Sequence, residues 1–144
     1  MTLREVTDFF EAYRDAFNRL DGDAVADLWH GASGITDNRH GLAALTWWPE
    51  DAPMRANHRA LCDVYRGADY GRADFEIVHH EPMGANHAFA RLRWTLQRRD
   101  GSLLQQFGTG YQLMRTADGP KGLKVLLATA FEEDLQEMTR PAAR

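Results

Sequence analysis

The sequence is poor in cysteine and in long apolar runs, and it carries no excess of positive charge. Its one cysteine, Cys62, leaves no disulfide to form within the chain, which favours a reducing compartment. No segment approaches the roughly 18 consecutive apolar residues of a membrane span, and the acidic N-terminus lacks the apolar run of a signal peptide. The net charge is −4 and arginines occur in runs of no more than two, whereas nucleic-acid-binding domains carry a basic face. We therefore expect a cytoplasmic protein that binds neither nucleic acid nor membrane.

Several residue patterns that carry chemistry are also missing. Neither of the two serines, Ser33 and Ser102, lies in a Gly-x-Ser-x-Gly motif, which excludes a serine hydrolase of that type. The neighbours His79 and His80 would point to opposite faces of a strand, and the lone cysteine has no partner, so we expect no metal site. The Gly-Thr-Gly stretch at residues 108–110 falls inside a predicted strand, so it is not a phosphate-binding loop. We expect no cofactor.

What is present is a chain of ordinary size and composition. Its 144 residues, 44% apolar and 26% charged, fit a soluble protein with one sizeable core. The sequence shows no internal repeat and no interdomain linker. We predict a single domain over residues 1–135 and a polar C-terminal tail over residues 136–144.

Three helices are predicted in the first half of the chain. Thr2 and Glu5 have the spacing of a capping box, and an apolar stripe of helical period follows them. A short second helix is predicted over residues 24–30 and a third over residues 55–68, whereas residues 38–51 show few periodic signals and are predicted to be irregular. The apolar stripes consist of Val6, Phe9, Phe10, Tyr13, Phe17 and Leu20 in the first helix, and of Met54, His58, Leu61, Cys62 and Tyr65 in the third.

From residue 73 onward the apolar period changes from helical spacing to two, which indicates strands. Strands are predicted at residues 33–37, 74–80, 88–98, 103–115 and 123–131. Helices followed by long antiparallel strands indicate an α+β fold, with the helices on one face of a bent sheet.

Asp100 and Gly101 have the composition of a tight hairpin turn in which both residues take positive φ. Counting outward from this turn gives the pairs Trp94–Phe107, Leu92–Thr109, Ala90–Tyr111 and Ala88–Leu113. These residues share one largely apolar side, which we expect to face inward, because a slip of one residue would move one strand's apolar set to the wrong side. The opposite side places Arg93 against Gly108 and is expected to meet solvent or a partner chain.

The last predicted strand is apolar on both faces. Leu123, Val125, Leu127 and Phe131 would lie on one side, and Leu126, Ala128 and Ala130 on the other. Since helices would cover only one face of the sheet, a second subunit is a natural cover for the other. We therefore predict a homodimer through the outer face of the sheet. The alternative is that Leu126 and the alanines are exposed singly, which is common.

Taken together, the aromatic first helix FFEAYRDAFNRLDGD, the helix AVADLWH, the ITD strand and the strands RWTLQRRDG, GTGYQLMRTADG and LKVLLATAF resemble the nuclear-transport-factor-2-like superfamily. That superfamily includes ketosteroid isomerase and the SnoaL-like polyketide cyclases. The resemblance implies a cone-shaped α+β barrel, in which a strongly curved, mixed but mainly antiparallel sheet packs three N-terminal helices on its concave face. It also implies a pocket between helices and sheet, and frequent dimers. One fold of this kind carries many functions.

The isomerase pattern can be compared residue by residue. Asp37 matches the position of the general base after the first strand. Tyr13 is the candidate for the oxyanion tyrosine, but it lies two residues further from the Gly-Asp turn than the pattern requires. The second oxyanion donor, an aspartate, has Gln112 as its nearest match, on the outer face. One part of three fits, which argues against steroid isomerisation and leaves proton abstraction beside a carbonyl open.

Two residues are candidates for catalysis. Asp37 could act as a general base if a pocket desolvates it, and its alternative role is that of a turn or cap aspartate. His58, on the inward stripe of the third helix, could be a base or a ligand contact, and its alternative is a hydrogen-bonded core histidine. The predicted pocket residues are Tyr13, Trp29, Trp47, Tyr65, Trp94, Thr109, Tyr111 and Phe131.

These features predict a SnoaL-like domain that binds an apolar small molecule inside the cone. Its chemistry would be acid–base isomerisation, cyclisation or dehydration of a hydrophobic carbonyl compound. The alternative is a non-catalytic ligand-binding or dimeric interaction module of the same fold, which a fully packed interior would favour.

Overall fold

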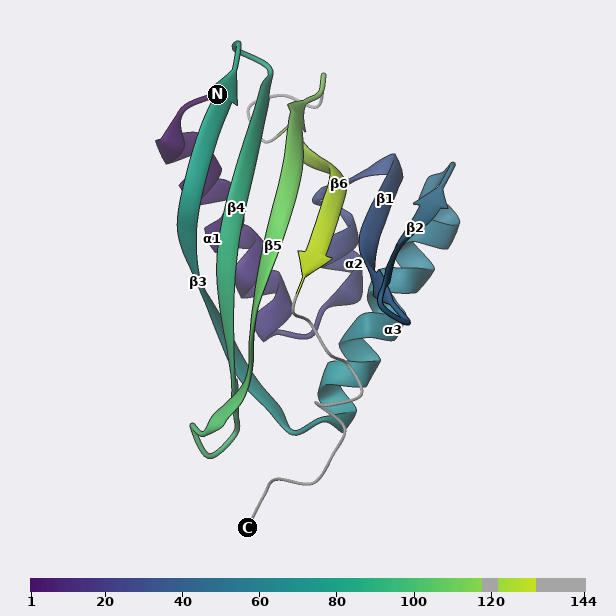
Figure 1. Cartoon of the computed structure of the whole chain (residues 1–144), viewed down its shortest axis with the longest axis vertical. Helices are drawn as coiled ribbons and strands as arrows, with labels where there is room; N and C mark the ends of the chain where they lie inside the picture. Colours follow the sequence, from purple (N-terminus) through teal and green to yellow (C-terminus); the bar gives the residue numbers. More distant parts are fainter. Residues whose placement is uncertain (118–121, 132–144) are drawn as a thin grey trace.

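The computed structural model of the chain describes residues 1–117 and 122–131. These residues form helices and strands whose arrangement is shown in Figure 1. In chain order the elements are α1 (Leu3–Asn18), α2 (Gly22–Ala26), β1 (Trp29–Arg39), β2 (Leu42–Trp48), α3 (Asp51–Gly67), β3 (Tyr70–Met83), β4 (His87–Arg98), β5 (Leu103–Arg115) and β6 (Leu123–Phe131). The tail predicted at residues 136–144 lies outside the described residues.

The strands form one open, six-stranded sheet in the order β2-β1-β6-β5-β4-β3. All neighbouring strands are antiparallel except β1 and β6, which run parallel. The helices lie on one side of the sheet (Figure 1), and the apolar core fills the space between helices and sheet. The architecture is therefore mixed α+β, as the sequence predicts. The face that carries the core residues Trp94 and Tyr111 is called the inner face below, and the opposite one the outer face.

Helix α1 begins where the sequence indicates, whereas α3 begins four residues earlier than predicted and α2 is shorter than predicted. The capping box of α1 is present, since Thr2 Oγ1 accepts the Glu5 N–H at 3.2 Å and the Glu5 carboxylate accepts the Thr2 N–H at 3.1 Å. Trp29, predicted in the second helix, is buried in β1 instead. The Leu28 carbonyl accepts the Val125 N–H of β6 at 2.9 Å, so pairing with a distant strand draws this segment out of the helix. No helix in the described part of the chain is both long and apolar enough to cross a membrane.

The prediction that residues 38–51 are irregular is wrong, because this stretch contains β2 and the start of α3. A tight turn at His40 and Gly41, with φ of 53° and 80°, joins β2 to β1 in an antiparallel pair. Two consecutive residues with positive φ are typical of a type I′ hairpin turn. The strand is hard to recognise from sequence because it is apolar on both faces: Trp48 is buried, whereas Trp47 is 49% exposed.

The β4–β5 hairpin has the predicted register, which places Trp94 on the inner face. Its turn is different from the predicted one. Gly101 has a φ of 86°, but Asp100 is not in the positive region. The Arg98 N–H donates to the Ser102 carbonyl at 2.8 Å, so the loop has three residues rather than two. A shift in the pairing next to the turn compensates for the extra residue and restores the predicted register.

The mixed pattern of β6 has a structural cause in its pairing with β5. Leu126 is an extra residue between Val125 and Leu127, whose partners on β5 are consecutive. A bulge of this kind reverses the alternation of side chains beyond it. Val125 and Ala128 therefore both lie on the inner face and are buried, and Phe131 lies on the outer face.

Candidate functional site

A cavity of about 80 Å³ lies between the inner face of the sheet and helices α1 and α3. That space is several times the roughly 10–15 Å³ that one water molecule needs. Its lining is mostly aromatic and aliphatic, and consists of Tyr13, Phe17, Trp29, Ile35, His58, Leu61, Tyr65, Tyr70, Ala73, Trp94, Leu96, Phe107, Thr109, Tyr111, Ala128 and Ala130. Six of the eight residues predicted for the pocket, together with His58, line this cavity.

Hydrogen bonds between indoles and hydroxyl groups hold the aromatic wall of the cavity. Trp29 Nε1 donates to the Tyr13 hydroxyl at 3.2 Å. Trp94 Nε1 donates to the Tyr111 hydroxyl at 3.0 Å and to Thr109 Oγ1 at 3.1 Å. A buried indole N–H without a partner would be costly, so these contacts allow both tryptophans to lie in a closely packed, mostly apolar wall.

Unlike the two indoles, the imidazole of His58 is buried without a hydrogen bond. The residue is 1% exposed, and within the described part of the chain neither ring nitrogen has a partner. Its ring packs against the indoles of Trp29 and Trp48, with centroids 4.6 and 6.1 Å away. Burial, with a smaller contribution from the positive charge of Arg55, lowers the pKa of His58 from 6.5 to about 4. The ring is therefore neutral at pH 7 and offers one donor and one acceptor nitrogen to whatever enters the cavity.

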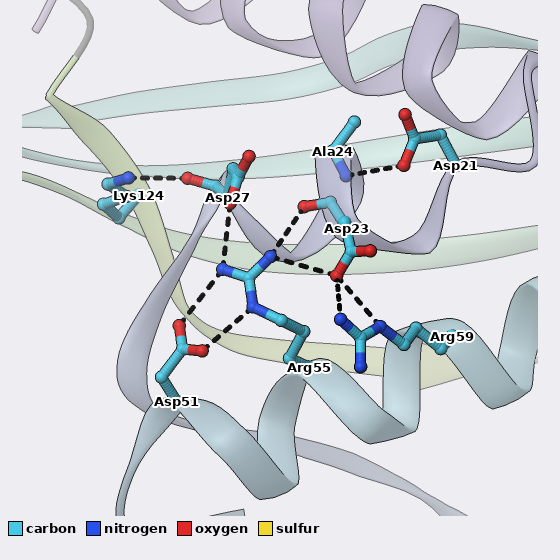
Figure 2. Close-up of polar contacts among 8 residues, drawn as sticks. All are labelled: Asp21, Asp23, Ala24, Asp27, Asp51, Arg55, Arg59 and Lys124. Carbon is cyan, nitrogen blue, oxygen red and sulfur yellow. Dashed lines mark hydrogen bonds and ion pairs between the residues drawn. The ribbon is translucent and has the colours of Figure 1, made fainter.

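A charged network fixes the helix that carries His58 (Figure 2). Arg55, one turn before His58 on α3, contacts Asp51 of its own helix at 2.9 Å. The same guanidinium pairs with Asp23, in α2, at 3.4 Å and with Asp27, just after α2, at 2.8 Å. The hydrogen bond from Arg55 lowers the pKa of the Asp51 carboxyl, so the acid stays ionised. This one side chain therefore joins the start of α3 to α2.

The contact between α2 and α3 is close as well as charged. A Cβ added to Gly22 would lie 2.7 Å from the Cα of Arg59, so the backbones of the two helices nearly touch there. Arg59 pairs with Asp23 at 2.7 Å, and Lys124 donates to the Asp27 carbonyl (Figure 2). These contacts hold α2 against the part of α3 that carries His58.

Asp37, the other catalytic candidate, is not among the described residues that line the cavity. It lies on β1 in an adjoining groove of about 260 Å³, between α3 and the β1–β2 hairpin. Its carboxylate pairs with Arg39 Nε at 3.0 Å, and Arg39 Nη2 also donates to Thr46 Oγ1 at 2.9 Å. The groove is lined by Ile35, Asp37, Arg39, Thr46, Trp48, Asn57, Ala60, Leu61, Val64 and Ala130. The structure thus separates the two candidates, with only His58 in the apolar cavity.

Trp47 and Phe131 were expected in the pocket, and the structure corrects both placements. Trp47 covers Gly34 on the outer face, since a Cβ added to that glycine would lie 2.8 Å from the indole ring. Phe131 covers Gly108 in the same way, with a corresponding distance of 2.2 Å. The cause is the unrecognised strand β2 for the tryptophan and the bulge in β6 for the phenylalanine. Neither feature follows from the alternation of apolar residues.

Sequence reasoning missed several residues of the cavity wall. Phe17 and Leu61 were not predicted as pocket residues. They do belong to the predicted apolar stripes of α1 and α3, so the sequence pattern indicated that their side chains face the core. Tyr70 lies outside the strand predicted at residues 74–80, because β3 begins four residues earlier. Its hydroxyl donates to Asn18 Oδ1 at 2.8 Å, and burial raises the pKa of its phenol.

The chemistry available in this cavity is that of one neutral imidazole among phenols, a hydroxyl and apolar rings. In residues 1–117 and 122–131 no three histidine, cysteine or acidic side chains lie close enough together to hold a metal ion. Such a site suits the binding of an apolar molecule with a single hydrogen-bonding group, or a proton transfer to or from it.

An open, six-stranded α+β sheet with helices on one face and a cavity beneath them defines a domain of the cystatin-like and NTF2-like kind. The family model described as NTF2-like protein (DUF6841) matches residues 4–129, and the chain belongs to this family. No curated protein matches the chain significantly.

Solved structures share this fold at low sequence identity. An NTF2-like protein of unknown function from Shewanella oneidensis is 13% identical with a TM-score of 0.69, covering 91% of this chain and 99% of its own. A ketosteroid isomerase-like protein from Erwinia carotovora is 17% identical with a TM-score of 0.62, covering 92% and 96%. A candidate dehydratase of the NTF2-like family from Streptomyces avermitilis is 14% identical with a TM-score of 0.61, covering 91% and 95%. These similarities establish the fold and leave the activity to be argued from the site.

Proposed function

We propose that this domain binds a largely apolar carbonyl compound in the cavity between helices and sheet, with His58 as its hydrogen-bond partner. The observation that carries the proposal is the pair of ring nitrogens of His58, 1% exposed and without a partner among the described residues. Buried polar groups are almost always hydrogen-bonded, so a site of this kind is usually completed by a ligand or by water.

The neutral state of His58 favours a carbonyl over a charged ligand group at this point. A neutral imidazole donates one N–H, which a carbonyl oxygen accepts. The rest of the wall is aromatic and aliphatic, so the remainder of the ligand gains by leaving water. One solved structure that shares the fold is a ketosteroid isomerase-like protein, and a ketosteroid carries a carbonyl group on an apolar skeleton.

Calorimetric titration with acetophenone and its hydrocarbon counterpart, isopropylbenzene, tests the proposal. The wild type should prefer the ketone by about tenfold, the worth of one good hydrogen bond in a dry site. His58→Leu should abolish this preference and still bind the hydrocarbon, whereas the matched control His87→Leu, at an exposed histidine, should keep it. Equal affinity of wild type for both compounds would show that His58 is a passive core residue.

Proton transfer by His58 is a second candidate function. Its lowered pKa makes it a weak base at pH 7, but weak bases of comparable pKa abstract protons beside carbonyls when the developing oxyanion is stabilised. The hydroxyls of Tyr13, Tyr111 and Thr109 lie in the same cavity wall. In deuterium oxide, His58 would remove a methyl proton of acetophenone and return a deuteron. Catalysed exchange that His58→Gln abolishes would support an enzyme, and binding without exchange would support a non-catalytic carrier.

We also propose that a second copy of the chain covers the outer face of the sheet. Leu45 and Trp47 are 61% and 49% exposed there. Further along the same face, the half-buried rings of Phe89 and Phe131 lie over glycines of β5. Adjacent exposed apolar side chains of this size are typical of protein interfaces.

A further inference from the structure

Resting on the proposed ligand-binding function, we infer that the ligand is a monocarboxylic acid. Its apolar end carries the carbonyl group that pairs with His58 in the cavity, and its carboxylate lies in the adjoining groove at Arg39. Arg39 is then the residue that sets the specificity of the site for an acid.

The first support is that the cavity and the groove adjoin one another. Ile35 of β1, Leu61 of α3 and Ala130 of β6 line both spaces, so these three small or aliphatic side chains form a common border. His58 lies one helical turn before Leu61 on α3. A ligand that reaches the imidazole and extends past Leu61 therefore enters the groove.

The second support is the change in chemistry along this path. The cavity is apolar apart from the groups already described, whereas the groove contains Asp37, Arg39, Thr46 and Asn57. Arg39 uses Nε and Nη2 for Asp37 and Thr46. In the part of the chain that the structure describes, Nη1 of Arg39 and the amide of Asn57 make no hydrogen bond. Nη1, on a side chain that is 53% exposed, is therefore left to donate to a carboxylate in the groove.

The third support is the charge balance at the groove. Both carboxylate oxygens of Asp37 lie near Arg39, at 3.0 and 3.4 Å, so an ammonium group arriving there would meet the guanidinium. Asp37 also offsets part of the positive charge of Arg39, and the chain as a whole carries a net charge of −4. This balance suits a single negative charge better than the double charge of a phosphate monoester.

The geometry also sets the form of the acid. Ile35, Asp37 and Arg39 alternate along one face of β1, which places Arg39 roughly 13 Å from Ile35 at the strand rise. The carboxylate and the apolar end must therefore be separated by an extended chain. ω-Benzoylalkanoic acids have this shape, with a ring and a ketone for the cavity and a flexible chain that ends in the acid.

The experiment is a binding titration with the ω-benzoyl acids from benzoylbutanoic to benzoyloctanoic acid and with the keto alcohols of the same chain lengths. Wild type should bind the best acid about tenfold more tightly than its alcohol. Arg39→Gln should weaken acid binding about tenfold and alcohol binding much less, which removes the preference, and Arg39→Lys should restore part of it. Asp37→Asn should strengthen acid binding, because it removes the competing carboxylate. Arg4→Gln, which removes an exposed arginine of α1, is the control for the loss of one positive charge.

The outcomes separate this inference from the proposed function. Binding of acids and alcohols with equal affinity, or a preference that survives in Arg39→Gln, overturns the carboxylate inference and leaves ligand binding in the cavity intact. Absence of binding for every member of both series overturns the proposed function as well. Thermal unfolding of each variant shows whether a lost affinity reflects a lost fold, and Thr46→Val, which removes only one Arg39 contact, then serves as the milder variant.

Discussion

His58 couples protonation to folding because its imidazole is buried in the neutral form. The folded chain takes up a proton at this residue near pH 4, whereas the unfolded chain does so near 6.5. Between these values the unfolded state binds more protons, so the free energy of unfolding falls as the pH falls through this window. From about pH 7 to about pH 4.5 we expect a loss of about 2–3 kcal/mol from this residue.

Urea unfolding of wild type and His58→Gln at both pH values measures this contribution. The variant should lose much less stability than wild type on acidification, and the matched control His79→Gln, at an exposed histidine, should lose as much as wild type. An equal loss in all three proteins would mean that the imidazole of His58 is solvated. The inward direction of His58 could be predicted from the helical stripe of α3. The absence of a partner could not, because it depends on Trp29 and Trp48, which come from other elements.

Among the elements, the pair α2 and α3 depends on a glycine at their closest approach. Gly22→Ala would bring a methyl group to 2.7 Å from the Cα of Arg59, so the helices must separate. We expect the free energy of unfolding to fall by about 1–3 kcal/mol. Gly67→Ala, where an added Cβ meets nothing within 4 Å, should instead raise it by about 0.5–1 kcal/mol. Chemical denaturation of the two variants checks both signs, and a Gly22→Ala protein as stable as wild type would contradict the tight contact.

How far each element could be predicted depended on whether local pattern or distant pairing decides it. The register of β4 and β5 follows from the alternation of apolar residues, and it holds although the turn at Gly101 differs from the predicted one. The strand β2, the early end of α2 and the bulge at Leu126 depend on partners far along the chain. Trp47 and Phe131 were wrongly placed in the pocket because the strand β2 and the bulge at Leu126 could not be predicted.

For the whole molecule, the proposed dimer predicts a solution mass of twice the chain's 16.3 kDa. Trp47→Arg places a charge in the proposed interface and should give a monomer. Leu3→Arg changes an exposed leucine on α1, 53% exposed and away from the outer face, and should leave the dimer intact. Light scattering coupled to size-exclusion chromatography distinguishes these species. A monomeric wild type, or a dimer that persists in Trp47→Arg, would contradict the proposed interface.

The fold class of the whole molecule could be predicted because the spacing of apolar residues within short segments distinguishes most of its helices from its strands. The ligand could not, because its site is assembled from α1, α3 and most strands of the sheet, and because side-chain patterns do not report which buried polar groups lack partners. Only the assembled structure separates His58 in the cavity from Asp37 in the groove.

Nitrogen NMR of the His58 ring during a titration with acetophenone tests the central claim most directly. We expect the ring to be neutral at pH 7 and to titrate near pH 4 rather than 6.5. We also expect the chemical shift of one ring nitrogen to change to that of a hydrogen-bonded nitrogen as the ketone binds. A ring that titrates near 6.5 and whose nitrogens do not respond to the ketone would contradict it.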